Sequence, residues 1–192
     1  SAKQKTPFAI VYLHGFSASQ EEGNPVHQNI AKEFGCNLYL ARLSEHGIDT
    51  TDALINMTAE SLFESAKQAY AIGKTLGKKV ILMSTSTGGT LALQLAAAYP
   101  DIAGLVLLSP NIAINDPNAW ITNNPWGLQI ARLVKGGKLN IVPNKTDQYK
   151  QYWNHEYRLE AVAELEELLE TAMQKKTFEK IKQPMLTLYY YK

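Results

Sequence analysis

The chain has 192 residues, a formal charge of +1 at pH 7 and an apolar fraction of 45%. It is long enough for one domain with a substantial core, and its balanced charge gives no electrostatic argument for binding nucleic acid or a membrane surface. No apolar stretch approaches the roughly 20 residues of a membrane span, and a single cysteine excludes an internal disulfide. We expect that cysteine, Cys36, to be buried in a strand.

Short apolar runs alternate with helical patterns along the chain. Nearly continuous apolar character predicts strands over residues 8–13, 38–41, 80–83, 105–108 and 185–191. Apolar residues at helical spacing predict helices over residues 25–34, 59–76 and 88–99. Thr58 is placed to cap the second helix, and Gly77 to end it. Such strands and helices are typical of an α/β fold with a doubly wound, mostly parallel sheet.

The alternation stops after Ser109 and Pro110. The following residues, to about residue 180, contain turns rich in Asn, Pro and Trp, and then an amphipathic helix near residues 156–173 whose glutamates we assign to a solvated face. No strand pattern of comparable strength interrupts this stretch, so we predict a helical cap inserted between two strands. The expected division is a core over 1–110, a cap over 111–182, and a further core strand over 183–192.

The six residues Ser84-Thr85-Ser86-Thr87-Gly88-Gly89 lie between a predicted strand and a predicted helix. A nucleophile on such a turn needs small residues two positions before and after it, and Ser84 and Gly88 flank Ser86 in this way. The turn would lift the Ser86 Oγ above the sheet. The backbone N–H of Thr87, at the helix N-terminus, would then face a developing negative charge beside that Oγ.

A second donor is expected from the loop His14-Gly15-Phe16, which follows the first predicted strand directly. Open parallel sheets place their sites at the carboxyl ends of strands, where this loop and the serine turn meet. We therefore predict an oxyanion hole made by the N–H groups of Phe16 and Thr87. His14 and Gly15 shape one loop of this site, and Gly88 the other.

Five stretches occur in the order seen in α/β-hydrolases, and the resemblance to that family extends over nearly all 192 residues: LHGFSAS, ARLSEHGI, STSTGGTLALQLAAAYP, LVLLSP and QPMLTLYYYK. They are most similar to the carboxylesterase and monoacylglycerol-lipase-like branch, which carries a helical cap. The resemblance implies a serine hydrolase that cleaves carboxylic esters through an acyl-enzyme on Ser86, with Phe16 and Thr87 as oxyanion donors. Ser84 stands where the family usually has glycine, and we interpret it as a tolerated small residue.

A serine nucleophile needs a histidine base oriented by a carboxylate, and in this fold both follow the serine in the chain. Only His155 follows Ser86, and it falls in the predicted cap. The resemblance thus implies that acid and base lie downstream of Lys192, in roughly 50 to 70 further residues, so that the fold is C-terminally incomplete and the isolated chain inactive. Asp116 is the in-chain alternative for the acid, and Asp147 is assigned to a turn.

The other histidines receive structural assignments. We expect His14 and His46 to shape loops, His27 to be exposed on a helix, and His155 to begin the cap helix. The cap aromatics either cover an acyl chain or pack between cap and core: Trp120, Trp126, Tyr149, Tyr152 and Trp153.

Other functions remain open at this point. One alternative is a non-catalytic α/β-hydrolase-like binding protein, and another is hydrolysis of thioester, lactone or C–C bonds on the same scaffold. No metal-ligand spacing or nucleotide-binding motif is found, so neither a metal nor a cofactor is predicted. The expected partners are a small-molecule ester and either a separate C-terminal fragment or a second copy of the chain. We expect a cytoplasmic protein.

Overall fold

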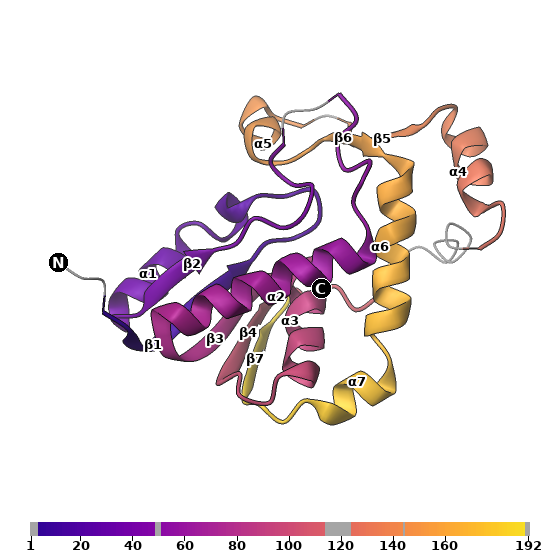
Figure 1. The fold of residues 1–192 in the computed structure, drawn as a ribbon. Helices are drawn as coiled ribbons and strands as arrows, with labels where there is room; N and C mark the ends of the chain where they lie inside the picture. The colour runs from indigo at the N-terminus through magenta and orange to yellow at the C-terminus, as the bar shows by residue number, and fades with distance from the viewer. Residues whose placement is uncertain (1–3, 49–50, 114–123, 144, 191–192) are drawn as a thin grey trace.

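A five-stranded parallel sheet forms the centre of the protein in the computed structural model, which describes residues 4–48, 51–113, 124–143 and 145–190 (Figure 1). The strand order is β2-β1-β3-β4-β7, and every neighbouring pair is parallel. In chain order the strands are β1 (Thr6–Leu13), β2 (Asn37–Leu40), β3 (Gly77–Thr85), β4 (Gly104–Leu108) and β7 (Met185–Leu188). The predicted α/β fold with a mostly parallel sheet is confirmed.

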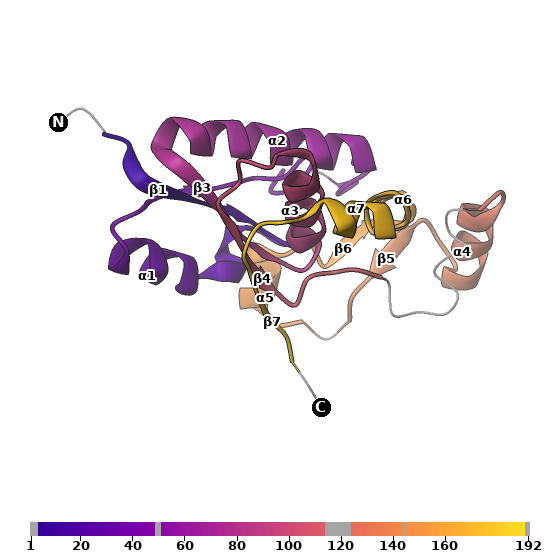
Figure 2. The same ribbon diagram turned by 90° about the horizontal axis from the view of Figure 1, so that it is seen from below.

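Helices cover both faces of the sheet. Helix α1 (Val26–Glu33) lies on one face, and α2 (Ala59–Leu76) and α3 (Thr87–Ala98) lie on the other (Figure 2). Alternate residues of β1 enter two different cores: Val11 and Leu13 pack on the α2 and α3 side, and Tyr12 packs with Ala31 of α1. Burial on both faces explains why the strand sequences are continuously apolar rather than alternating.

Helix α2 has the bounds that the sequence predicts. Thr58 Oγ1 accepts a hydrogen bond from the Ser61 N–H at 3.0 Å, and Ser61 Oγ accepts one from the Thr58 N–H at 3.0 Å. This reciprocal capping box satisfies two backbone donors at the helix start. At the other end, Gly77 is extended rather than left-handed and begins β3, where a Cβ would collide with the backbone of Ala9.

Residues between β4 and β7 form an insertion with more strand than the sequence suggested. Its elements are α4 (Gly127–Lys135), β5 (Leu139–Ile141), α5 (Asp147–Tyr152), β6 (Glu156–Arg158), α6 (Leu159–Ala172) and α7 (Lys175–Lys180). Besides the expected helices, the insertion contains two short strands, β5 and β6, which pair antiparallel. Each strand is only three residues long, so neither produces an apolar run. The long helix therefore begins at Leu159 rather than at residue 156.

Helix α6 attaches the insertion to the core by packing against α2 and α3 (Figure 1). Polar contacts reinforce this packing, since the Arg158 guanidinium bonds to both Asp52 (2.9 Å) and Glu160 (2.6 Å), and Glu164 Oε2 accepts the Ala59 N–H at 3.0 Å. The assignment of all the helix glutamates to a solvated face is wrong at Glu166, which is buried.

Two apolar surfaces are left open. A groove of about 450 Å³ lies on the α1 side of the sheet, and Cys36 lines it instead of lying inside a strand as expected. On β7, Met185 and Leu186 are each about half exposed.

Within the described ranges, no helix has the length and apolar character needed to cross a membrane.

The capping box allows a stability test. Replacing Thr58 with Ala (T58A) removes an acceptor from the start of α2 and is expected to lower the free energy of unfolding by about 1 kcal/mol. Thr75→Ala is the matched control, because Thr75 is exposed at the far end of the same helix and bonds only to the Ile72 carbonyl. Chemical denaturation of both variants would contradict the assignment if Thr58→Ala lost no more stability than Thr75→Ala.

Candidate active site

Ser86 occupies the sharp turn between β3 and α3 that the sequence predicts. Its backbone has φ 51° and ψ −119°, a conformation that non-glycine residues rarely adopt. The end of β4 holds this turn in place. The Ser86 N–H donates to the Leu108 carbonyl at 3.0 Å, and the Ser86 carbonyl accepts the Asn111 N–H at 2.9 Å. The Ser86 side chain itself is half-buried.

Two glycines bring the first turn of α3 against the ends of two strands. A Cβ on Gly88 would overlap the Leu13 carbonyl and lie 2.7 Å from the carbonyl oxygen of His14. A Cβ on Gly89 would lie 2.7 Å from the Cβ of Pro110. Only residues without a side chain permit this approach. The N-terminus of α3 is therefore wedged between the end of β1 and the end of β4.

The loop after β1 reaches the serine turn. The position that a Cβ on Gly15 would occupy lies 3.1 Å from the Cβ of Ser86, so this glycine packs directly on the proposed nucleophile. The Gly15 carbonyl is held by the ring Nδ1 of His14 at 2.9 Å. The Gly15–Phe16 peptide is trans, which points the Phe16 N–H away from that carbonyl.

The two N–H groups assigned to the oxyanion hole have no hydrogen-bond acceptor within the described part of the chain. Neither the Phe16 N–H nor the Thr87 N–H donates to a protein acceptor there. Backbone N–H groups without a protein partner, one on the loop packed on Ser86 and one directly after Ser86, are suited to receive a ligand oxygen.

His14 and His46 are buried and locked as neutral rings. Nε2 of His14 accepts the Leu43 N–H at 3.1 Å, and Nε2 of His46 accepts the Ser17 N–H at 3.0 Å. A nitrogen that accepts from a backbone N–H carries no proton, so each ring is protonated only on Nδ1, which donates to a carbonyl. Burial lowers the pKa of His14 to about 3 and that of His46 to about 4. Both rings have the structural role predicted for them.

The remaining predicted residues lie as follows. His27 is fully buried rather than exposed, since its Nε2 donates to the Gln20 carbonyl at 2.9 Å and its ring meets Tyr12 edge-on. His155 does not begin a helix but precedes β6. Ser84 is completely buried. Asp116 and Trp120 lie outside the described residues.

The insertion contacts the loop after β1 through backbone and aromatic groups. The Asn154 N–H donates to the Ser17 carbonyl at 2.8 Å. The ring of Phe16 packs edge-on against Tyr157 of β6, with centroids 5.0 Å apart. Of the cap aromatics, Tyr149 and Trp153 stack on each other, whereas Trp126 is largely exposed. The insertion thus touches the residue that supplies one of the two proposed oxyanion donors.

Glu22 is the residue near the serine turn that the sequence analysis missed. It lies in η1, a short 3-10 helix (Gln20–Gly23), and its Oε2 accepts the Gly15 N–H at 2.7 Å. Burial raises the pKa of this carboxyl. The available sequence signal was a carboxylate seven residues after the glycine of the loop, which is too weak a pattern to predict a contact.

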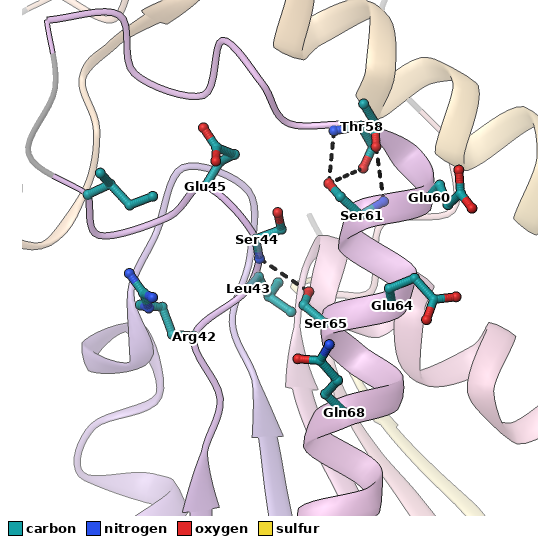
Figure 3. A pocket seen from close by; sticks show the side chains of 11 residues that line it. Arg42, Leu43, Ser44, Glu45, Thr58, Glu60, Ser61, Glu64, Ser65 and Gln68 are labelled. Atoms are coloured by element: carbon teal, nitrogen blue, oxygen red, sulfur yellow. Dashed lines mark hydrogen bonds between the residues drawn. The ribbon is translucent and has the colours of Figure 1, made fainter.

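A polar cleft of about 590 Å³ lies between the loop after β2 and the first half of α2 (Figure 3). The Ser44 N–H joins its two walls by donating to Ser65 Oγ at 3.2 Å. Ser86, Phe16 and Thr87 do not line the cleft, so it is separate from the serine turn. Among the described residues, no group of three His, Cys, Asp or Glu side chains forms a metal-binding arrangement.

Solved structures of lipolytic enzymes share this fold. A structure from LipS and LipT, two metagenome-derived lipolytic enzymes, superposes with a TM-score of 0.78 at 16% identity, over 96% of this chain and 72% of that one. The monoacylglycerol lipase of Paleococcus ferrophilus superposes with a TM-score of 0.68 at 20% identity, over 98% and 76%. At these identities the likeness shows a shared fold.

A family match shows the class of protein. Residues 57–190 match the family described as serine aminopeptidase, S33, so the chain belongs to that family, within the α/β-hydrolases. A thermostable monoacylglycerol lipase of Bacillus sp. (strain H-257) is 31% identical over 111 residues. That match covers 58% of this chain and 43% of the lipase, so it spans less than half of the relative's length.

The contact made by Gly88 can be tested by adding one methyl group. We expect Gly88→Ala to lower the free energy of unfolding by about 1–3 kcal/mol, since its Cβ would meet the rigid backbone at the end of β1. Gly137→Ala is the control, because a Cβ there meets nothing within 4 Å. Equal thermal midpoints for the two variants would show that α3 does not press on β1 as described.

The buried histidines predict how stability depends on pH. Unfolded histidine takes up a proton near pH 6.5, whereas folded His14 and His46 do so only near pH 3 and pH 4. The unfolded state therefore binds more protons in this window, and stability is lost as the pH falls from 6.5 toward 4, by up to about 1.4 kcal/mol per pH unit for each histidine. Denaturation at several pH values measures this slope. The slope should be smaller in His46→Gln, and an unchanged slope would refute the assignment.

Proposed function

We propose that this chain belongs to a serine hydrolase that cleaves carboxylic esters, with Ser86 as the nucleophile and the N–H groups of Phe16 and Thr87 as oxyanion donors. The observation that carries the proposal is the strained backbone of Ser86 between β3 and α3, with Gly15 packed on its side chain. Such strain persists only where the surrounding structure enforces it, and it is concentrated at active sites. Lipase relatives make an ester the favoured substrate.

The proposed reaction starts with attack of the Ser86 Oγ on the ester carbonyl carbon. The carbonyl oxygen gains negative charge, which the N–H groups of Phe16 and Thr87 stabilise together with the N-terminal end of the α3 dipole. Collapse of this intermediate expels the alcohol and leaves an acyl group on Ser86. Water then releases the carboxylic acid by the same steps.

The serine needs a proton acceptor, and the buried histidines do not fit this role. Both ring nitrogens of His14 and of His46 are already engaged by the backbone, and His27 is fully buried beneath Tyr12. We propose that the base and its carboxylate partner come from protein outside the described residues. The chain itself supplies the nucleophile and the oxyanion donors.

We also propose that the insertion serves as a cap over this site. In this view residues 1–110 and 183–192 belong to the core, and residues 111–182 form the cap. The contacts of Asn154 with Ser17 and of Tyr157 with Phe16 support the proposal, because they put the insertion beside the oxyanion loop. The substrate is a small-molecule ester.

The nucleophile is tested on the full natural gene product. We expect Ser86→Ala to lower kcat for p-nitrophenyl esters by at least about 10⁴-fold and to abolish labelling by a fluorophosphonate probe, since no other hydroxyl takes over the attack. Ser65→Ala, which removes a hydroxyl from α2, is the control. Aminoacyl p-nitroanilides, assayed in parallel, distinguish ester from amide cleavage.

Two results would overturn the proposal. One is ester turnover that survives Ser86→Ala at the wild-type rate. The other is a full natural protein that neither hydrolyses esters nor reacts with the probe, which would favour a non-catalytic binding protein.

A further inference from the structure

We infer that Glu22 is a positioning residue for the oxyanion loop: its carboxylate holds the His14–Gly15–Phe16 turn so that the Phe16 N–H faces Ser86 before substrate arrives. The inference rests on the proposed function of Ser86. Glu22 lies outside the serine turn and belongs to η1, so no step of the proposed reaction uses it.

The first observation is the direct hydrogen bond to the loop. Glu22 Oε2 accepts the Gly15 N–H at 2.7 Å, a length typical of a strong, charge-assisted bond. His14 holds the same glycine by its carbonyl at 2.9 Å. The two peptide groups that flank Gly15 are therefore fixed independently, one by Glu22 and one by His14, and the Phe16 N–H belongs to the second of them.

The second observation is how closely the carboxylate approaches the serine. A Cβ on Gly15 would lie 2.9 Å from Glu22 Oε1 and 3.1 Å from Ser86 Cβ. The Glu22 carboxylate and the Ser86 side chain thus pack on the same glycine, and no side chain at residue 15 fills the space between them. A displaced Glu22 would leave space beside Gly15 into which the loop could relax, moving its N–H away from the oxyanion.

The third observation places Tyr12 of β1 between Glu22 and the serine turn. Burial raises the pKa of the Glu22 carboxyl, and Tyr12 opposes this shift. The Tyr12 hydroxyl also lies 2.8 Å from Thr85 Oγ1. Thr85 immediately precedes Ser86, so Tyr12 interacts with both halves of the proposed site.

This arrangement favours positioning over proton transfer. Glu22 Oε2 is engaged by the Gly15 N–H, and this bond holds the carboxylate to the loop. A group that only fixes a donor needs hydrogen-bond acceptors but no particular charge. Glutamine retains one such acceptor at the same distance from the backbone, whereas alanine retains none.

The test compares Glu22→Ala with Glu22→Gln in the full natural protein. With kcat expressed per fluorophosphonate-titrated site, we expect Glu22→Ala to lower kcat roughly 10- to 100-fold with little change in KM, because the lost interaction acts in the transition state. Glu22→Gln should restore kcat to within about threefold of wild type. Glu21→Ala is the matched control, since the neighbouring carboxylate bonds to Asn24 on the surface, and it should leave kcat unchanged.

A readout independent of catalysis completes the test. The Gly15 amide proton should resonate far downfield in wild type and in Glu22→Gln, and should move upfield in Glu22→Ala, as its acceptor is removed. The inference is overturned if kcat per titrated site is unaffected in Glu22→Ala, or if Glu22→Gln is as impaired as Glu22→Ala. If instead Ser86→Ala keeps wild-type activity, the proposed function itself has failed. The chemical shift of the Gly15 amide proton then remains as the test of whether Glu22 holds the loop.

Discussion

The close approach of α3 to the end of β1 is the contact on which the site depends. Gly88 lies so near the Leu13 carbonyl that no side chain fits between them. This contact brings the Thr87 N–H, at the start of α3, to the same place as the loop that carries Phe16. Both N–H groups belong to the backbone, so their positions depend on how α3 and the loop after β1 are held. The packing of one helix on one strand thus brings the two halves of the proposed oxyanion hole together.

Much of the fold follows from local patterns in the sequence. Continuous apolar runs predicted the strands, because a strand that is buried on both faces has apolar residues at almost every position. Thr58 predicted the start of α2, because a capping residue marks a helix N-terminus in the sequence. The pairing of β5 with β6 left none, since each strand is only three residues long and forms no apolar run. The burial of His27 was hidden for a similar reason, because Tyr12 and Gln20 reach it from separate segments.

The candidate site was predictable where its parts adjoin strand ends. Ser86, Thr87 and the His14-Gly15-Phe16 loop were found because a strand followed by small residues and a helix constrains the backbone. Glu22 was not found, because its role arises from a contact with Gly15 that no spacing encodes. The tautomers of His14 and His46 likewise depend on which backbone N–H groups the folded loops direct at their Nε2 atoms.

The bond between the Asn154 N–H and the Ser17 carbonyl has a consequence for how this protein can diversify. Because both partners are backbone groups, substitutions of the side chains around them leave the bond available. The aromatic residues of α5 can therefore be exchanged while the loop after β1 keeps this anchor. Under the proposed function, the insertion can vary in sequence without disturbing the backbone groups proposed to stabilise the transition state.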